Sequence, residues 1–574
     1  MEESPLKTEP DLVSPSAPTT AAPPLARTLP RRIWLRITAV MRAHPLVVDG
    51  AAVITVIASS AAVQLLYLQP PQPSDQMFYF YRAGEFPDPS IVEHKTLRIG
   101  LLLPVKVFQR LFGTSEAAYY AVPLLSGVLL VVATYAVGRL LFGRVIGVGA
   151  GAVIGLSPVF LLESSHLLPD IPSAALFATA TWLVLVACRR IERHGTVHTG
   201  DQIALVFAGL LLGWAYLTRE YLVFLFPLAA FIFWVHGVSF RRLVWVTVPV
   251  ASVFVGEVAL NTAVYGEPLA RLTLTGGHSG SVPLGNTDRL DLLFRLPSGL
   301  AQFTSGPVLV MLLVLLLLAG FVRRRPFRII LAWFLLLWLP LTLLSGFVLD
   351  PELRFLRTHK IRYWFPLFPT VAIGGLAMVR HLMQGFLESE TASPWVRRHG
   401  APLAVGVMAF FVSWYGFQSI AESRRFRVNG ADQIADLREW LREEGQDVDV
   451  LWTDDRTMHL LPLATNSTFG DPVWRGTMRS FQANDPDPFD DVAEFASKEE
   501  IDRGAIVIFN QGLAYLPEGR DSAPHYILYP EESEGWKRHE IDDQLQMVVY
   551  EKTTPNPGGS TAVGSSPSPR SSWR

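Results

Sequence analysis

The sequence has little charge, a single cysteine and no long tract of basic residues. Asp, Glu, Lys and Arg make up 17% of its 574 residues, whereas an ordinary soluble protein has about 25%. Cys188 alone cannot form an internal disulfide or a thiolate metal cluster. The formal net charge of -2 gives no electrostatic footprint for nucleic acid. These absences exclude a disulfide framework and a nucleic-acid partner, and the low charge argues against a soluble protein.

Apolar residues take the place of the missing charge. They make up 50% of the chain, and the mean hydropathy is +0.29. A helix needs about 20 mostly apolar residues to cross the hydrocarbon core of a bilayer, and about eleven segments meet that requirement. These segments are centred near Val56, Leu129, Val153, Ala178, Leu210, Leu228, Val250, Leu315, Leu335, Ile373 and Gly406. The sequence therefore predicts a polytopic α-helical membrane protein.

Basic residues alternate between the two ends of the predicted spans and so set their orientation. They precede the first span and collect again at alternate loops, at Arg31, Arg32, Arg36, Arg42, Arg189, Arg190, Arg241, Arg242, Arg323, Arg324, Arg325, Arg328, Arg397 and Arg398. Because basic loops stay in the cytoplasm, we expect a cytoplasmic amino terminus and a first span that acts as an uncleaved anchor. An odd number of spans then puts the loop 69–118 and everything after about residue 417 on the outer face of the plasma membrane.

Composition divides the chain into four predicted regions. Residues 1–44 are rich in Pro, Ser, Thr and Ala and predict a basic, disordered cytoplasmic segment, whereas residues 45–422 predict the membrane domain. Residues 423–552 predict a small extracytoplasmic α/β domain, with a helix over 431–443 and strands over 448–452, 505–509, 525–529 and 546–550. The Pro/Gly/Ser-rich tail 553–574 is predicted to be disordered.

An acidic residue, Asp75, follows the first predicted span closely. It begins a segment that predicts an interfacial helix, on which Tyr79 and Arg82 are candidate substrate contacts. A carboxylate at a membrane surface, backed by a polytopic scaffold, is suited to chemistry on a lipid-borne substrate. The structural alternative is that Ser74 caps this helix and Asp75 complements the positive end of its dipole.

A second polar group lies at the outer junction of the third and fourth spans and contains Glu163, His166 and Asp170. Pro169 removes a backbone donor and clashes with the turn before it, so Asp170 is expected in the first turn of the fourth span. There it is a candidate catalytic residue or a partner of the helix dipole. Because oxygen and imidazole ligands suit several metals, the three side chains are also candidate ligands of a divalent metal ion, with headgroup contact as the alternative.

Basic residues just outside the tenth predicted span form a third group, although outer loops tend to lack them. Arg362 is predicted to hold a phosphate through two parallel hydrogen bonds, with Lys360 as a second point charge and Tyr363 beside them. The alternative is that the cations snorkel while Tyr363 and Trp364 anchor the interface. Arg219, between the fifth and sixth spans, is a further phosphate-binding candidate or half of an internal ion pair with the next residue.

Several short motifs follow the acidic first loop in a definite order. They are Leu111–Ala118, Gly138–Gly143, Ser157-Pro158, Leu167–Pro172, Leu217–Glu220 and Arg362–Pro369. In that order they resemble the GT-C membrane glycosyltransferases, and within them the dolichyl-phosphate-mannose protein mannosyltransferase and aminoarabinose transferase branch. The resemblance covers about residues 51–379. It implies a GT-C-like fold and inverting transfer of a sugar from a polyprenyl-phosphate carrier to an acceptor on the outer face.

The resemblance also implies a role for the first-loop aspartate, here Asp75, as the catalytic base. A lipid phosphate leaves as a stabilised anion, so one carboxylate can suffice where cations meet the departing charge. Arg362, Lys360 and Arg219 are the expected phosphate clamp. Relatives that mannosylate proteins tend to carry two successive acids in this loop, whereas Gln76 follows Asp75 here. The acceptor, whether glycan, lipid or protein, therefore stays open.

Two other classes of protein share such a scaffold. A transporter of lipid-linked sugars would also be polytopic, but it tends to place ionisable residues near the bilayer midplane, where Glu257 is the main candidate. A non-catalytic lipid-binding or assembly subunit would keep the scaffold without turnover. Turnover of the carrier distinguishes the three classes: an enzyme consumes the carrier-linked sugar, a transporter moves it unchanged, and a subunit does neither.

Overall fold

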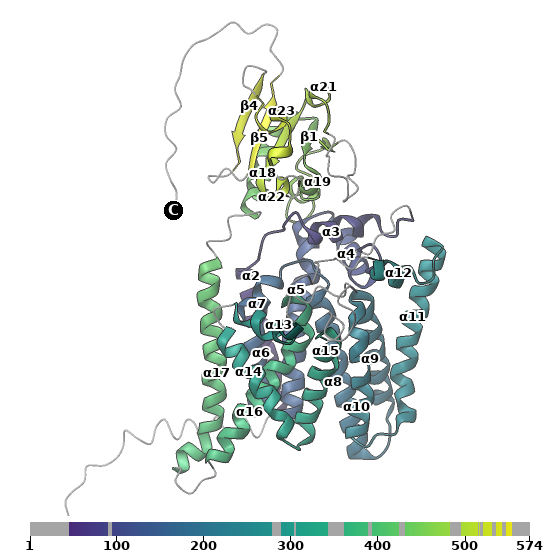
Figure 1. Ribbon diagram of the computed structural model, residues 1–574, viewed down its shortest axis with the longest axis vertical. Helices are drawn as coiled ribbons and strands as arrows, with labels where there is room; N and C mark the ends of the chain where they lie inside the picture. Colours follow the sequence, from purple (N-terminus) through teal and green to yellow (C-terminus); the bar gives the residue numbers. More distant parts are fainter. Residues whose placement is uncertain are drawn as a thin grey trace, which may run out of the picture. The chain divides into compact units, whose positions relative to one another are not determined.

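The predicted fold class, a polytopic helical protein with a small C-terminal α/β domain, is confirmed by the computed structural model (Figure 1). The structure describes residues 45–89, 95–277, 289–302, 306–342, 361–387, 393–423, 431–482, 495–514, 516, 520–530, 535–541 and 547–553. The predicted disordered segment 1–44, and the predicted disordered tail 553–574 apart from Thr553, therefore lie outside the described residues. Backbone contacts divide the chain into Met1–Ile54 and Thr55–Arg574. Apart from the start of the first helix, everything below belongs to the second unit.

Seven helical stretches of the described chain are long and apolar enough to cross a membrane. They comprise the helices α2 (Pro45–Leu66), α5 (Glu116–Phe142), α8 (Asp170–His194), α9 (Thr199–Thr218), α11 (Val244–Tyr265), α15 (Arg325–Thr342) and α16 (Phe368–Leu387). Shorter apolar helices are α6 (Arg144–Gly155), η2 (Glu220–Leu225) with α10 (Pro227–Val235), and α14 (Gly306–Leu318) with η4 (Ala319–Phe321); α17 runs over Pro394–Ser423. Each predicted span centre lies within one of these helices.

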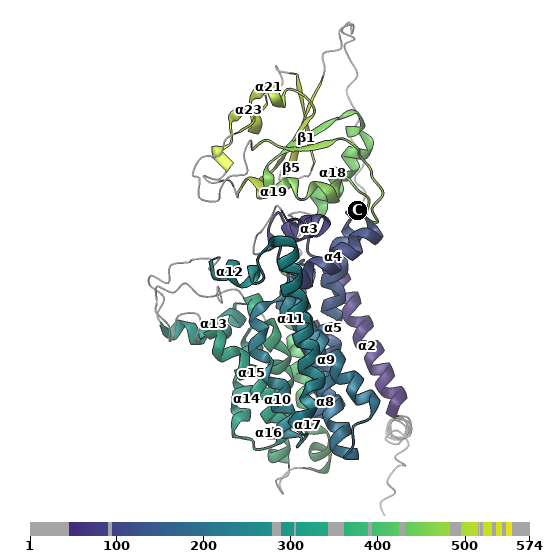
Figure 2. The same ribbon diagram turned by 90° about the vertical axis from the view of Figure 1, so that its right-hand side faces the viewer.

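Glycines allow several of the membrane helices to approach closely. A Cβ atom on Gly209 of α9 would come within 2.4 Å of the Val246 carbonyl oxygen at the start of α11, and one on Gly147 of α6 within 2.7 Å of the Tyr135 carbonyl oxygen in α5. Close packing through small residues matters in a bilayer because lipid tails leave little hydrophobic driving force between helices. Both views accordingly show α8, α9 and α11 side by side (Figures 1 and 2).

Short helices between the spans carry most of the candidate site. The predicted interfacial helix is present as α3 (Asp75–Glu85), which buries Met77, Phe80 and Ala83 and packs against α4 (Ile99–Phe112). The others are α7 (Pro158–Glu163), η3 (Phe240–Leu243), α12 (Ala270–Gly277), α13 (Arg289–Ala301) and η6 (Ile361–Leu367). The side chain of Gln76, the residue that replaces a second acid, is buried and accepts a hydrogen bond from the Tyr119 hydroxyl in α5. Position 76 is thus part of the packing between α3 and α5.

The C-terminal domain begins with the predicted helix, α18 (Ala431–Glu443), and contains a mixed five-stranded sheet of order β2-β1-β3-β5-β4. Strands β2 (Thr477–Ser480), β1 (Val450–Thr453) and β3 (Ala505–Phe509) are parallel, and β5 (Met547–Lys552) and β4 (Trp536–Glu540) continue the sheet antiparallel. The remaining elements are η8 (Gly445–Asp447), α19 (Asp455–Met458), α20 (Leu461–Ala464), α21 (Lys498–Ile501), α22 (Asn510–Leu513), η9 (Arg520–Ser522) and α23 (His525–Leu528).

The apolar side chains of the central strand β3 point alternately to the two faces of the sheet and contribute to an apolar layer on each face. Val507 and Phe509 pack on the side of α18, where Ile434, Leu437, Trp440 and Leu441 form the predicted apolar stripe. Ile506 and Ile508 pack on the other side. A strand that is buried on both faces carries a continuous apolar run, and this run is what made β3 predictable from sequence.

The predicted strand over 525–529 is wrong, because His525–Leu528 forms the short helix α23. Its aromatic and β-branched residues favour a strand, but Ile527 and Leu528 are both buried in succession against the sheet. Strands β2 and β4 were not predicted. Both lie at edges of the sheet. The side chains of β2 alternate between exposed and partly buried, and those of β4 are mostly exposed apart from Trp536. Edge strands of this kind carry little apolar signal.

A buried carboxylate at the end of β1 makes the stability of the C-terminal domain depend on pH. Burial raises the pKa of Asp454 to about 6, although hydrogen bonds from Thr457 and Arg456 act in the opposite direction. In the unfolded chain this carboxyl has its ordinary pKa of 3.8, so stability should fall as pH rises from about 4 through about 6 and then level off.

Asp454→Asn can still accept the 2.9 Å bond from the Thr457 amide but carries no buried charge. We expect its thermal midpoint to match the wild type near pH 4 and to exceed it increasingly up to pH 7. Asp447→Asn, at an exposed acid before β1, is the matched control and should show a smaller, pH-independent change. A difference between Asp454→Asn and wild type that stays flat from pH 4 to pH 7 would contradict the assignment.

Candidate active site

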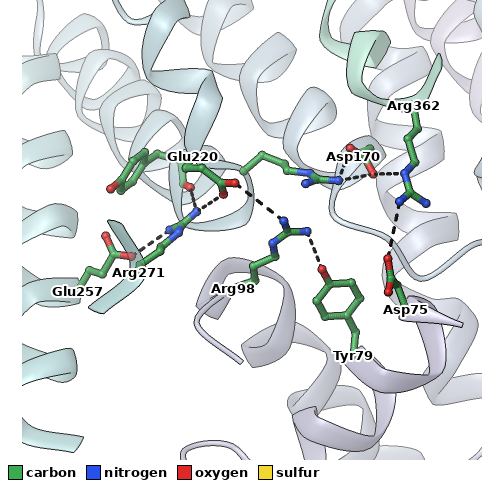
Figure 3. Close-up of polar contacts among 10 residues, drawn as sticks. Asp75, Tyr79, Arg98, Asp170, Glu220, Glu257, Arg271 and Arg362 are labelled. Atoms are coloured by element: carbon green, nitrogen blue, oxygen red, sulfur yellow. Dashed lines mark hydrogen bonds and ion pairs between the residues drawn. The ribbon is translucent and has the colours of Figure 1, made fainter. Parts of the chain in front are cut away.

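Asp75 is the first residue of α3 and lies between two cations, Lys95 and Arg362, of which Figure 3 shows Arg362. Its Oδ1 atom lies 2.9 Å from Lys95 Nζ, and its Oδ2 atom lies 3.7 Å from Arg362 Nη2. The side chain is 41% exposed, so solvent or a ligand can reach it. Ser74 occupies the N-cap position but makes no capping hydrogen bond through its side chain. Ser74 therefore caps α3 through its backbone carbonyl only, while Asp75 lies in the first turn, where a carboxylate complements the helix dipole as the structural alternative expects.

The cations around Asp75 determine its ionisation. Burial alone would raise its pKa, but the charge and hydrogen bond of Lys95, followed by the charges of Arg362 and Arg98, outweigh that effect. The pKa of Asp75 is therefore about 2. Asp75 is a carboxylate at any physiological pH.

Arg362 links Asp75 to a second carboxylate, Asp170 (Figure 3). As predicted from Pro169, Asp170 lies in the first turn of α8, and its side chain is 2% exposed. Arg362 Nε lies 3.9 Å from Asp170 Oδ2. Arg219, just after α9, donates from Nη2 to the same Oδ2 at 2.9 Å and lies 2.7 Å from Oδ1. Carboxylates and guanidinium groups thus alternate from Asp75 to Arg219.

A second polar chain begins at Tyr79 of α3. The Tyr79 hydroxyl accepts a 2.6 Å hydrogen bond from Arg98 Nη1, and Arg98 Nη2 lies 3.9 Å from Glu220 Oε1 (Figure 3). Arg271 then donates to Glu220 at 3.1 Å and to Glu257 at 2.9 Å. Burial raises the pKa of Tyr79 to about 12, so its hydroxyl keeps its proton. Glu257 is therefore paired with a buried arginine in this chain.

The predicted neighbour of Arg362, Tyr363, lies against both arginines of the first chain. Its ring centroid is 4.9 Å from Arg219 Cζ and 5.8 Å from Arg362 Cζ, within the range of a cation–π contact. Its carbonyl oxygen accepts a hydrogen bond from the Tyr221 hydroxyl at 3.2 Å. Trp364 is buried, which contradicts the alternative that it anchors a membrane interface. The aromatic residues of this segment instead pack around the charged groups.

Two predicted contacts fall outside this arrangement. Arg82 pairs with Glu85 at 2.9 Å and lies against the rings of Phe78 and Tyr81, so the contacts described for it are within α3 itself. Lys360 lies outside the described residues. Lys95, which was not predicted, lies beside the Asp75 carboxylate.

The predicted metal ligands are not gathered into one site. Glu163 Oε2 lies 3.3 Å from His166 Nδ1, while Asp170 is bound by the arginines. Within the described residues, no three His, Cys, Asp or Glu side chains are placed to hold a metal ion together. The ligand set proposed from sequence is wrong for a simple reason: Asp170 begins a new helix after Pro169, and Arg219 and Arg362 already meet its charge.

Three residues that the sequence analysis missed complete the site: Lys95, Arg98 and Arg271. Lys95 and Arg98 lie in the loop 69–118, which is predicted to be outer and where cations are then as unexpected as they are beside Arg362. The same argument applied to that loop would have found them. Arg271 had no such signal, because it is one arginine in a segment of ordinary composition.

Comparisons with known proteins show which family and which folds the chain is similar to. Residues 102–263 match the family described as dolichyl-phosphate-mannose-protein mannosyltransferase. The crystal structure of ArnT from Cupriavidus metallidurans in the apo state has a TM-score of 0.54 at 13% identity and covers 89% of this chain and 100% of that one. ArnT from the same organism bound to undecaprenyl phosphate has a TM-score of 0.55 at 13% identity, with 88% and 99% covered. No curated protein matches the chain by sequence.

The chain therefore has a multi-span helical scaffold, a charged site at the helix ends and a small C-terminal domain, a family match over residues 102–263, and the fold of the ArnT structures over nearly its whole length. These findings bear out the predicted resemblance to the GT-C membrane glycosyltransferases of the protein mannosyltransferase and aminoarabinose transferase branch.

Proposed function

We propose that this protein transfers a sugar from a polyprenyl-phosphate carrier to an acceptor hydroxyl on the outer face of the membrane. The observation that carries the proposal is the meeting of an ionised, accessible carboxylate, Asp75, with the cations Lys95 and Arg362. Asp75 and Lys95 come from one loop and Arg362 from a distant part of the sequence. Together they supply the two things that the reaction needs, a proton acceptor and positive charge for a departing phosphate.

In the proposed reaction, Asp75 takes the proton of the acceptor hydroxyl as its oxygen forms a bond to the anomeric carbon. The bond from that carbon to the carrier phosphate oxygen breaks, and its electron pair stays on the phosphate. Lys95 and Arg362 stabilise the added negative charge, because guanidinium and ammonium groups bind phosphate oxygens through charge-assisted hydrogen bonds. A phosphate needs no proton in order to leave, so a second carboxylic acid is not required. Attack opposite the leaving phosphate inverts the anomeric configuration.

The second carboxylate, Asp170, has a supporting part in this proposal. It is buried and bound to Arg219, so it is poorly placed to take a proton from an acceptor. Its charge orients Arg362 toward the site and offsets the burial of Arg219. The ArnT structure with undecaprenyl phosphate shows that this fold can hold such a carrier, and we extend that ligand class to this chain as part of the proposal.

Carrier turnover tests the proposal directly. The purified protein in proteoliposomes is given undecaprenyl-phosphate-linked mannose or pentose and a membrane extract as the source of acceptors. We expect free undecaprenyl phosphate to accumulate together with a glycosylated product, and neither should form in empty liposomes. Movement of intact carrier between leaflets would indicate a transporter, and binding without consumption would indicate an assembly subunit; either result would overturn the enzyme assignment.

A further inference from the structure

The cations that a carrier phosphate needs are already occupied by Asp75 in this structure. Lys95 Nζ and Arg362 Nη2 lie 2.9 and 3.7 Å from its two carboxylate oxygens. A phosphate that bound Lys95 and Arg362 would place its oxygens where the carboxylate oxygens now lie. The two anions cannot both keep these contacts and would repel one another at close range.

A carboxylate held in this way is also a weak base. The same contacts that hold the pKa of Asp75 near 2 reduce its tendency to take a proton from an acceptor hydroxyl. Arg98 acts in the same direction from farther away, and the Tyr79 hydroxyl beside it stays neutral. Asp75 is therefore ionised but restrained while the site is empty.

We propose that Asp75 and the carrier phosphate compete for Lys95 and Arg362, so that the carrier binds first and, by taking these cations, releases Asp75 to accept the acceptor's proton. This inference rests on the proposed function and concerns the order of events at that site. Asp75 would then stay paired with the two cations, and act only weakly as a base, until the leaving phosphate is bound.

The contacts of both cations allow such an exchange. Arg362 keeps Asp170 as a second partner at 3.9 Å, and its buried Nε has no hydrogen-bond partner within the described residues. Lys95 Nζ lies 4.6 Å from the centroid of the Phe78 ring and is partly exposed. Each cation can therefore turn away from Asp75 without losing every neighbour. Arg219 differs, because both of its close carboxylate contacts are to the buried Asp170.

Carrier binding without any sugar transfer tests the competition. Sugar-free undecaprenyl phosphate is titrated into the full-length protein in neutral-lipid nanodiscs. Asp75→Asn and Asp75→Ala should both bind it at least about threefold more tightly than wild type, as expected for removing partly exposed ion pairs that compete with the ligand. Using both variants separates loss of charge from a new hydrogen bond donated by asparagine. Lys95→Met should weaken binding.

Glu85→Gln is the matched control, because Glu85 lies at the other end of α3, is 38% exposed and is also paired with a cation. Its affinity should equal that of the wild type. In a Lys95→Met background, Asp75→Ala should raise the affinity for undecaprenyl phosphate by a smaller factor, because one of the two cations for which the anions compete is gone. If both Asp75 variants bind undecaprenyl phosphate no more tightly than the wild type, the proposed competition is wrong, whereas the role of Asp75 as the base is not affected. Normal turnover with a gain in affinity would instead remove the base role alone.

Discussion

Asp75→Asn is expected to lower the rate of sugar transfer by at least about 100-fold, the lower end of what a positioned general base contributes. The substitution removes the charge and the proton-accepting oxygen with almost no change of shape. Because Asp75 is 41% exposed and lies at the start of a surface helix, the fold should survive. The measurement is the initial rate of product formation from undecaprenyl-phosphate sugar in proteoliposomes, at equal amounts of monodisperse protein.

Glu85→Gln again provides the comparison, since it removes a carboxylate of similar exposure from the same helix. Its transfer rate should stay within about twofold of wild type, as for most surface substitutions that are remote from a site. Near-normal turnover by Asp75→Asn would eliminate Asp75 as the base. If Asp75→Asn and Glu85→Gln lower the transfer rate equally, the effect comes from removing any carboxylate from α3 and is not specific to Asp75.

Hydropathy predicted the membrane helices well because a span must keep its apolar residues together over many turns. Even short helices such as α6 and α14 were found at their predicted centres. The signal is weaker in the C-terminal domain after α18, where the strands are four to six residues long and an edge strand such as β4 is largely exposed. There α23 was mistaken for a strand because composition alone cannot distinguish the two over four residues.

The site was predicted less completely, because its residues meet only through the fold. Local arguments placed Asp75 and Asp170 at helix starts, and the anomaly of outer cations singled out Arg362. The sequence could not show which of these charged side chains form ion pairs with one another. Arg219 pairs with Asp170, and its neighbour Glu220 binds Arg271. The metal hypothesis was wrong for the same reason, since a sequence does not show that a carboxylate is already taken by an arginine.

Arg219→Met is expected to destabilise the protein strongly, because it leaves the Asp170 carboxylate buried without its main partner. Arg219 is 3% exposed and Asp170 2% exposed, and removing one member of a buried ion pair costs about 3–5 kcal/mol. Arg325→Met is the matched control. Arg325 makes an ion pair of similar length, 2.8 Å, with Glu192, but the two side chains are 59% and 38% exposed, so about 0–1 kcal/mol is expected. The measurement is the thermal midpoint of each variant in nanodiscs.

Arg219→Met/Asp170→Asn removes both charges and should recover most of the lost stability, since no buried ion is then left unpaired. Equal midpoints for Arg219→Met and Arg325→Met would contradict the burial argument. The double variant also separates two roles of Arg219, which sequence analysis placed in the phosphate clamp. If sugar transfer returns with stability, Arg219 serves only to offset the buried charge of Asp170. If stability returns but transfer and carrier affinity stay low, while Asp170→Asn alone binds the carrier normally, then Arg219 contacts the phosphate, and the site uses a third cation beyond Lys95 and Arg362.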